Sequence, residues 1–81
     1  MTRDEEIKMA AAIGAVEDEY RRATAKHGPL AGPHEGYAVI LEELDELWAE
    51  VKAQHPDPVR LRAEACQVAA MGLRFMVDVV P

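Results

Sequence analysis

A dense group of glutamates at residues 42–50 has the clearest potential for chemistry in this sequence. The run EELDE covers residues 42–46, and Glu50 follows about one helical turn later. In a helix, side chains three or four residues apart share one face, with about 5–6 Å between their Cβ atoms. Hard divalent cations such as Mg²⁺ take oxygen ligands from carboxylates. The spacing therefore predicts that Glu43 and Glu46 can form one side of a metal site.

A second helix must supply the other side of such a site, and the sequence offers Glu64. Arg74 follows further along the same side of the same predicted helix. The break at residues 54–57 is short, and short connections favour antiparallel neighbouring helices. We therefore expect Glu43 and Glu46 to face Glu64 across a helix–helix contact.

Three helices position these residues, so we predict an all-α fold in a single domain, residues 1–81. Apolar residues recur at helical spacing over about residues 3–26, 33–53 and 58–79. Segments rich in proline and glycine interrupt this pattern between the helices. The short connections predict a three-helix antiparallel bundle.

The apolar residues of the second and third predicted helices indicate an assembly larger than one chain. Tyr37 and Trp48 lie on the main apolar stripe of the second helix, so we expect core packing for both rather than stacking on a nucleobase. The third helix is apolar on more than one side, and such a helix is usually buried on several sides. A chain of 81 residues has too little material to cover it. We expect a dimer or tetramer packed largely through this helix.

Composition excludes several classes of partner. The chain has 15 acidic and 9 basic side chains and a formal net charge of −6, which argues against nucleic-acid binding. No stretch approaches the roughly 18 uncharged apolar residues of a membrane span.

A single cysteine, Cys66, excludes an internal disulfide and favours a reducing, cytoplasmic setting. We expect Cys66 to be a buried, inert thiol.

The two acidic elements, EExxE at residues 42–46 and ExxQ at residues 64–67, resemble the EExxE…ExxD signature of MazG-like, all-α nucleotide pyrophosphohydrolases. The wider runs at residues 34–48 and 67–75 look like short MazG-like proteins of phages and bacteria. The resemblance covers about residues 26–79. It implies an oligomeric helical bundle that uses Mg²⁺, or alternatively Mn²⁺, to cleave a nucleoside triphosphate between the α and β phosphates. The products would be a nucleoside monophosphate and pyrophosphate.

By position, the resemblance assigns Glu43, Glu46 and Glu64 to the metal ion and Glu42 to the attacking water. A metal ion neutralises phosphate charge and lowers the pKa of a bound water, and a free carboxylate can orient or deprotonate that water. One position departs from the family pattern, because Gln67 stands where the family has its closing aspartate. Glutamine offers a neutral oxygen, so metal binding should be weaker.

His34, Gln67 and Arg74 are the candidates for substrate binding. His34 opens the second helix, where exposed N–H groups favour a phosphate, although a surface or capping role is the more common explanation at such a position. Arg74 lies near the side of Glu64 and Gln67, so it is a candidate phosphate contact. The alternative for Arg74 is an ion pair with Asp78, four residues further on.

Three functions remain open from the sequence. The first is an active nucleotide pyrophosphohydrolase. The second is a catalytically weakened module that binds a nucleotide without turning it over, which Gln67 favours. The third is a structural helical oligomer with a solvated acidic face, because charge runs on helices are commonly solvent-facing.

Overall fold

The computed structural model describes residues 1–81 and contains three helices and no strand. Helix α1 spans Arg3–His27, α2 spans Pro33–Val51 and α3 spans Pro58–Asp78. The predicted all-α class and the three helices are confirmed, with ends that differ from the expected ones by one or two residues. None of the three helices has the length and hydropathy of a membrane span.

Polar caps explain where the helices begin and end. The Thr2 hydroxyl accepts a hydrogen bond from the Glu5 N–H at 3.1 Å and caps α1. The Asp57 carboxylate accepts from the Val59 N–H at 2.9 Å and caps α3. α1 ends at Gly28, whose φ of 71° lies in the left-handed region that glycine tolerates. These local signals make the helix boundaries readable from the sequence.

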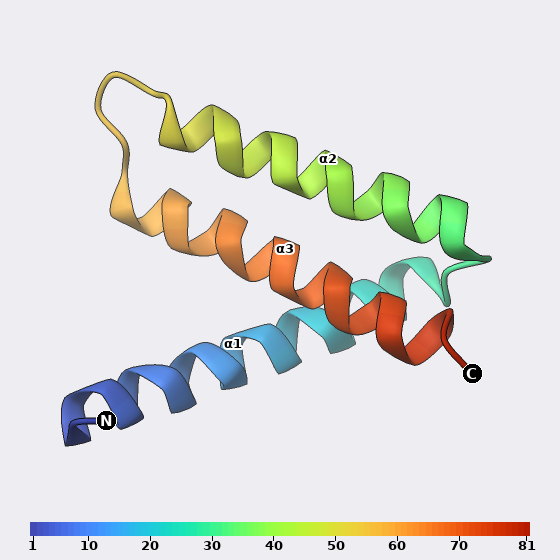
Figure 1. Ribbon diagram of the computed structural model, residues 1–81, viewed down its shortest axis with the longest axis horizontal. Coiled ribbons are helices and arrows are strands. Elements are labelled where there is room, and N and C mark those ends of the chain that lie inside the picture. The colour runs from blue at the N-terminus through green and yellow to red at the C-terminus, as the bar shows by residue number, and fades with distance from the viewer.

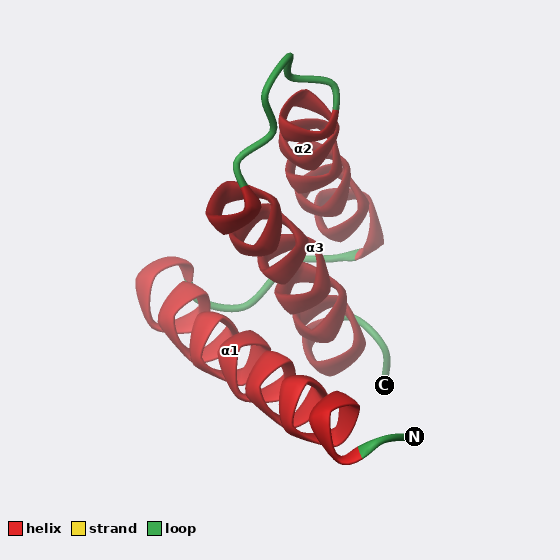
Figure 2. Ribbon diagram, turned by 90° about the vertical axis from the view of Figure 1, so that its left-hand side faces the viewer, coloured by secondary structure: helices red, strands yellow, loops and turns green.

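Helix α3 lies between the other two helices and organises the fold (Figures 1 and 2). α2 packs antiparallel beside it, and α1 crosses its other side, whereas α1 and α2 do not pack against each other. The N-terminal part of α1 projects away from the rest of the molecule (Figure 1). The carboxylates expected on α2 and α3 are therefore carried by the two helices with the most extensive contact.

Two hydrogen bonds tie the α1–α2 connection to the last turns of α3. The Leu30 N–H donates to the Asp78 carboxylate at 3.0 Å, and Arg74 Nη2 donates to the Gly28 carbonyl at 2.7 Å. The alternative ion pair between Arg74 and Asp78 does not form. Instead, each side chain satisfies a backbone group of the connection, which would otherwise lack a partner.

The protomer has a very small core, and the core assignment of Tyr37 and Trp48 is wrong for one chain. These side chains are 65% and 57% exposed, because the inner side of α2 carries Gly36, Val39, Ile40 and Glu43, and the rest of its apolar stripe points outward. Helical periodicity identifies an apolar stripe but not what covers it. Only six of 81 residues are buried in the protomer: Ala23, Leu30, Gly36, Ala70, Met71 and Arg74.

Gly36 marks a tight contact between α2 and α3. A Cβ added there would lie 2.5 Å from Cδ2 and 2.8 Å from Cε2 of Phe75. We expect Gly36→Ala to lower the free energy of unfolding by about 1–3 kcal/mol, because the aromatic ring must move. Urea denaturation followed by circular dichroism measures this change.

Gly14→Ala is the matched control. Gly14 lies in exposed α1 with no atom within 4 Å of an added Cβ. There, alanine should raise the free energy of unfolding by up to about 1 kcal/mol through its higher helix propensity. Stabilisation by both substitutions would contradict the tight contact at Gly36.

Candidate metal centre

Three carboxylates from two helices converge at the α2–α3 contact. Glu43 and Glu46 lie one turn apart on α2, and α3 runs antiparallel beside α2 (Figure 1). Glu64 of α3 lies opposite the two glutamates. One oxygen of each carboxylate lies within 4.8 Å of the others. Glu43 and Glu64 are half-buried and Glu46 is exposed. We refer to these three side chains as the carboxylate cluster.

Simultaneous ionisation of all three side chains of the carboxylate cluster is unfavourable. The pKa of Glu43 is raised to about 7, first by burial and then by the charge of Glu46 and a hydrogen bond with it, with smaller effects of Glu64 and Glu42. The pKa of Glu64 is also raised, first by burial and then by Glu46 and Glu50. Like charges this close disfavour ionisation until a proton or another cation joins them.

Two oxygens of the carboxylate cluster have no hydrogen-bond partner. Oε2 of Glu43 and Oε2 of Glu64 are both closed to solvent and unpaired, whereas buried polar atoms in proteins nearly always have a partner. No basic side chain neutralises the cluster, because Arg60 pairs with Glu50 at 3.7 Å instead. A hard divalent cation would satisfy these oxygens and offset their charge.

A polar cavity of about 310 Å³ adjoins the carboxylate cluster, between the three helices. Glu43 belongs to both the cluster and the cavity wall. Glu42 and Gln67 also line the cavity, and so does Arg74, which is only 3% exposed. A metal ion held by the cluster would therefore lie at the edge of a chamber of ligand size.

His34 is the one predicted site residue that lies neither in the carboxylate cluster nor on the chamber wall. It lies beside Pro33 and Tyr37 on the exposed start of α2. Glu35 lines the chamber instead, because neighbouring positions of a helix point in directions about 100° apart.

Helix α1 contributes chamber residues that the sequence did not reveal. Glu19 and Arg22 lie on the wall and bond to each other, with Arg22 Nε donating to Glu19 Oε2 at 2.9 Å. This bond lowers the pKa of Glu19, and a hydrogen bond with Gln67 lowers it further. In the sequence the two residues look like an ordinary surface pair three positions apart. His27 lines the chamber as well, although its position at the helix end required no further role.

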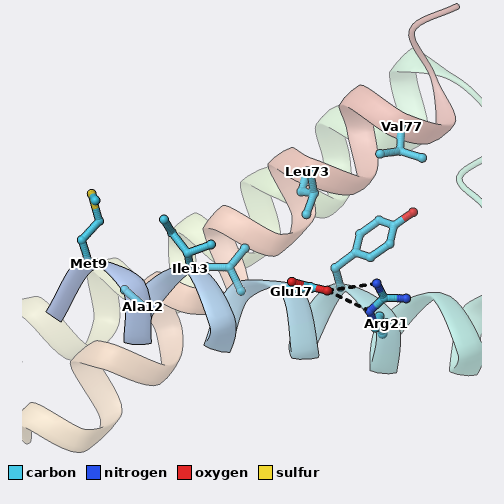
Figure 3. A pocket seen from close by; sticks show the side chains of 9 residues that line it. Met9, Ala12, Ile13, Glu17, Arg21, Leu73 and Val77 are labelled. Atoms are coloured by element: carbon cyan, nitrogen blue, oxygen red, sulfur yellow. Dashed lines mark hydrogen bonds and ion pairs between the residues drawn. The ribbon is translucent and has the colours of Figure 1, made fainter. Parts of the chain in front are cut away.

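The largest hollow on the molecule is apolar and separate from the carboxylate cluster. It is a groove of about 520 Å³ between α1 and α3, lined by Met9, Ile13, Leu73 and Val77 among others (Figure 3). The pair of Glu17 and Arg21 borders it (Figure 3). Most of its lining residues are hydrophobic, so the groove is suited to packing against another apolar surface rather than to catalysis.

In comparisons with known proteins, no family model, curated protein or solved structure matches the chain. The functional interpretation therefore depends on the geometry of the α2–α3 contact. Three carboxylates beside a polar chamber suit a hard divalent cation together with a polar ligand.

The raised pKa of Glu43 predicts that the metal-free protein loses stability as the pH rises. Between the ordinary value of 4.5 and the folded value of about 7, the folded chain binds more protons than the unfolded chain. The free energy of unfolding should therefore fall across this window. Glu43→Gln keeps the side chain neutral, so it should remove most of this slope and be more stable than the parent at pH 8 in EDTA. Urea denaturation at a series of pH values measures both effects.

Asp45→Asn serves as the control, because Asp45 is exposed on α2 and lies outside the carboxylate cluster. It should keep the slope of the parent protein. If Glu43→Gln keeps the parent's slope of unfolding free energy against pH, ionisation of the carboxylate cluster does not cause the loss of stability.

Proposed function

We propose that this chain is a Mg²⁺-dependent nucleotide pyrophosphohydrolase of the MazG-like type. It would cleave a nucleoside triphosphate between the α and β phosphates to a nucleoside monophosphate and pyrophosphate. The observation that carries the proposal is the convergence of Glu43, Glu46 and Glu64 from two helices. The resemblance of residues 26–79 to MazG-like enzymes supplies the reaction type.

The carboxylate cluster is suited to hold Mg²⁺, or Mn²⁺, through one oxygen of each side chain. Mg²⁺ prefers octahedral coordination and commonly keeps waters and phosphate oxygens beside one or two carboxylates. Three ligands from the protein leave positions free for a phosphate. When bound, such an ion neutralises phosphate charge and lowers the pKa of a coordinated water.

The residues around the carboxylate cluster support roles in handling the substrate. Glu42 neighbours Glu43 and lines the chamber, so its carboxylate can orient or deprotonate the attacking water. Gln67 and Arg74 line the same chamber, which supports both as substrate contacts. His34 lies outside the chamber and has no role in this proposal.

A nucleotide-binding module with little or no turnover is the second candidate function. Gln67 favours it, because this side chain carries no charge and is engaged with Glu19. The metal would then have three carboxylates rather than the four of the family signature. A purely structural helical oligomer explains the structure less well, because a solvated acidic face would not close off Oε2 of Glu43 and Oε2 of Glu64.

The same proposal includes a homo-oligomer, with a second copy covering the outer face of α2. This face carries an apolar seam whose members recur at alternating steps of four and three and are 41–65% exposed: Tyr37, Leu41, Leu44, Trp48 and Val51. Such spacing is typical of helices that pair along a seam. The sequence pointed to α3 as the main interface, and the exposure of this seam adds α2.

Mg²⁺ should stabilise the parent protein through the carboxylate cluster. At a hundred times its Kd, an ion that binds only the folded state raises the free energy of unfolding by about 2.7 kcal/mol. We expect Glu46→Gln to abolish this response, because the variant removes a charged ligand from the exposed edge of the cluster. Chemical denaturation with and without Mg²⁺ measures the response, and Asp45→Asn should behave like the parent. An equal Mg²⁺ response in Glu46→Gln would exclude Glu46 as a ligand.

Glu42 should contribute more to turnover than to metal binding. We expect Glu42→Gln to lower kcat about 10²–10⁴-fold, the usual contribution of a general base, while the Mg²⁺ stabilisation persists. Ion-exchange chromatography of a panel of nucleoside triphosphates incubated with Mg²⁺ separates monophosphate and pyrophosphate from diphosphate and phosphate. A parent protein that binds a non-hydrolysable analogue with Mg²⁺ but turns over none of the panel would favour the binding module.

Assembly should depend on the apolar seam of α2. We expect Trp48→Glu to shift the protein to smaller species at micromolar concentration, because it buries a charge in the proposed contact. Light scattering after size-exclusion chromatography measures the mass. Ile7→Glu is the control, since Ile7 is 58% exposed on α1 and lies outside both the seam and α3. An unchanged mass for Trp48→Glu would place the interface elsewhere.

A further inference from the structure

Arg74 is a buried cation with an unused donor. Its side chain is 3% exposed, and Nη2 donates to the Gly28 carbonyl at 2.7 Å. Nη1 reaches only the sulfur of Met71, a weak acceptor, at 3.5 Å, while Nε is buried without a partner. No carboxylate forms an ion pair with it. Since a buried donor without an acceptor is costly and Arg74 lines the chamber, a ligand in the chamber could supply the missing acceptor.

The rest of the chamber wall disfavours a bare anion. Four carboxylates line it, Glu19, Glu35, Glu42 and Glu43, whereas the other guanidinium group on the wall, that of Arg22, is already paired with Glu19, and His27 also lines the wall. Carboxylates accept hydrogen bonds and repel negative charge. A neutral group with an amino donor beside a carbonyl or ring-nitrogen acceptor would satisfy both the carboxylates and Arg74.

The remaining wall and the size of the chamber suit a flat heterocycle. Apolar contacts come from Ala23, Leu30, Val39 and Met71. The volume of about 310 Å³ is near the lower end of ligand pockets, which run from about 300 to 1,000 Å³. There is room for one nucleoside.

The chamber also has the right position relative to the carboxylate cluster. Glu43 belongs to both, and ten residues of α3 separate Glu64 from Arg74, about 15 Å of helical rise. A nucleotide with its phosphates at the cluster would extend its other end along α3 toward Arg74.

We propose that this chamber is a nucleobase site, in which Arg74 Nε donates to a carbonyl oxygen or ring nitrogen and wall carboxylates accept from an exocyclic amino group. The assignment of this end to a base rests on the proposed function, whereas the pattern of donors and acceptors belongs to the chamber itself. Adenine, cytosine and guanine carry an amino group with two N–H donors beside an acceptor, whereas uracil and thymine offer a single N3–H between two carbonyls. Because several carboxylates line the wall, the site selects bases that carry an amino group.

Nucleosides without phosphate test this site apart from the metal. The full chain is titrated in EDTA with cytidine, adenosine, uridine or inorganic phosphate, and backbone amide NMR shifts report binding. We expect cytidine or adenosine to perturb residues of the chamber with saturation, uridine to bind at least tenfold more weakly, and phosphate to give no saturable change. Failure of the metal site would appear in the Mg²⁺ titration instead, so the two proposals can fail separately.

Two variants locate the binding. Arg74→Lys keeps the charge but loses Nε, and Val39→Phe fills the chamber without altering Arg74; each should weaken nucleoside binding at least tenfold. Circular dichroism checks that both variants are folded. If Arg74→Lys does not fold, the result for Val39→Phe decides the outcome. Asp45→Asn on the outer surface should bind like the parent. The proposal is overturned if no nucleoside binds the parent, if uridine binds as well as cytidine, if phosphate saturates the chamber, or if a folded chamber variant binds like the parent.

Discussion

Repulsion among three carboxylates is the constraint on which this structure depends. The packing of α2 against α3 brings one carboxylate oxygen from each of Glu43, Glu46 and Glu64 within 4.8 Å of the others. Two unit charges 4 Å apart repel by about 1 kcal/mol in water and by about 4 kcal/mol near a protein surface. In the free protein burial raises the pKa of Glu43 to about 7 together with this repulsion, and the proton that Glu43 then holds relieves both. A divalent cation can take over the role of that proton, so helix packing and metal binding are coupled.

The inward position of Glu43 on α2 has consequences for the rest of the molecule. The apolar seam of α2 points outward, which leaves only six buried residues in the protomer and a surface that a second copy can complete. The α1–α2 connection is held by Arg74 and Asp78 from α3 rather than by a large core. Those bonds hold the end of α1 near α3, where Glu19, Arg22 and His27 line the chamber. The hydrogen bonds of Arg74 and Asp78 therefore support both the fold and the chamber.

The sequence predicts the parts of this arrangement that depend on local spacing. The three helices follow from caps and periodicity, and the approach of Glu64 to the acidic face of α2 follows from a spacing of three and a short connection. The outward position of Trp48 could not be predicted, because periodicity does not say which surface covers a stripe. The place of Glu19 in the chamber depends on how α1 crosses α3. The separate bonds of Arg74 and Asp78 depend on backbone groups that only the folded chain brings near.

The most direct test of the carboxylate cluster as a metal site is an anomalous diffraction map from crystals grown with Mn²⁺. The account predicts a single strong peak at the α2–α3 contact, coordinated by one oxygen from each of Glu43, Glu46 and Glu64. A map without that peak, or one in which Glu64 turns toward solvent while the ion binds elsewhere, would contradict it.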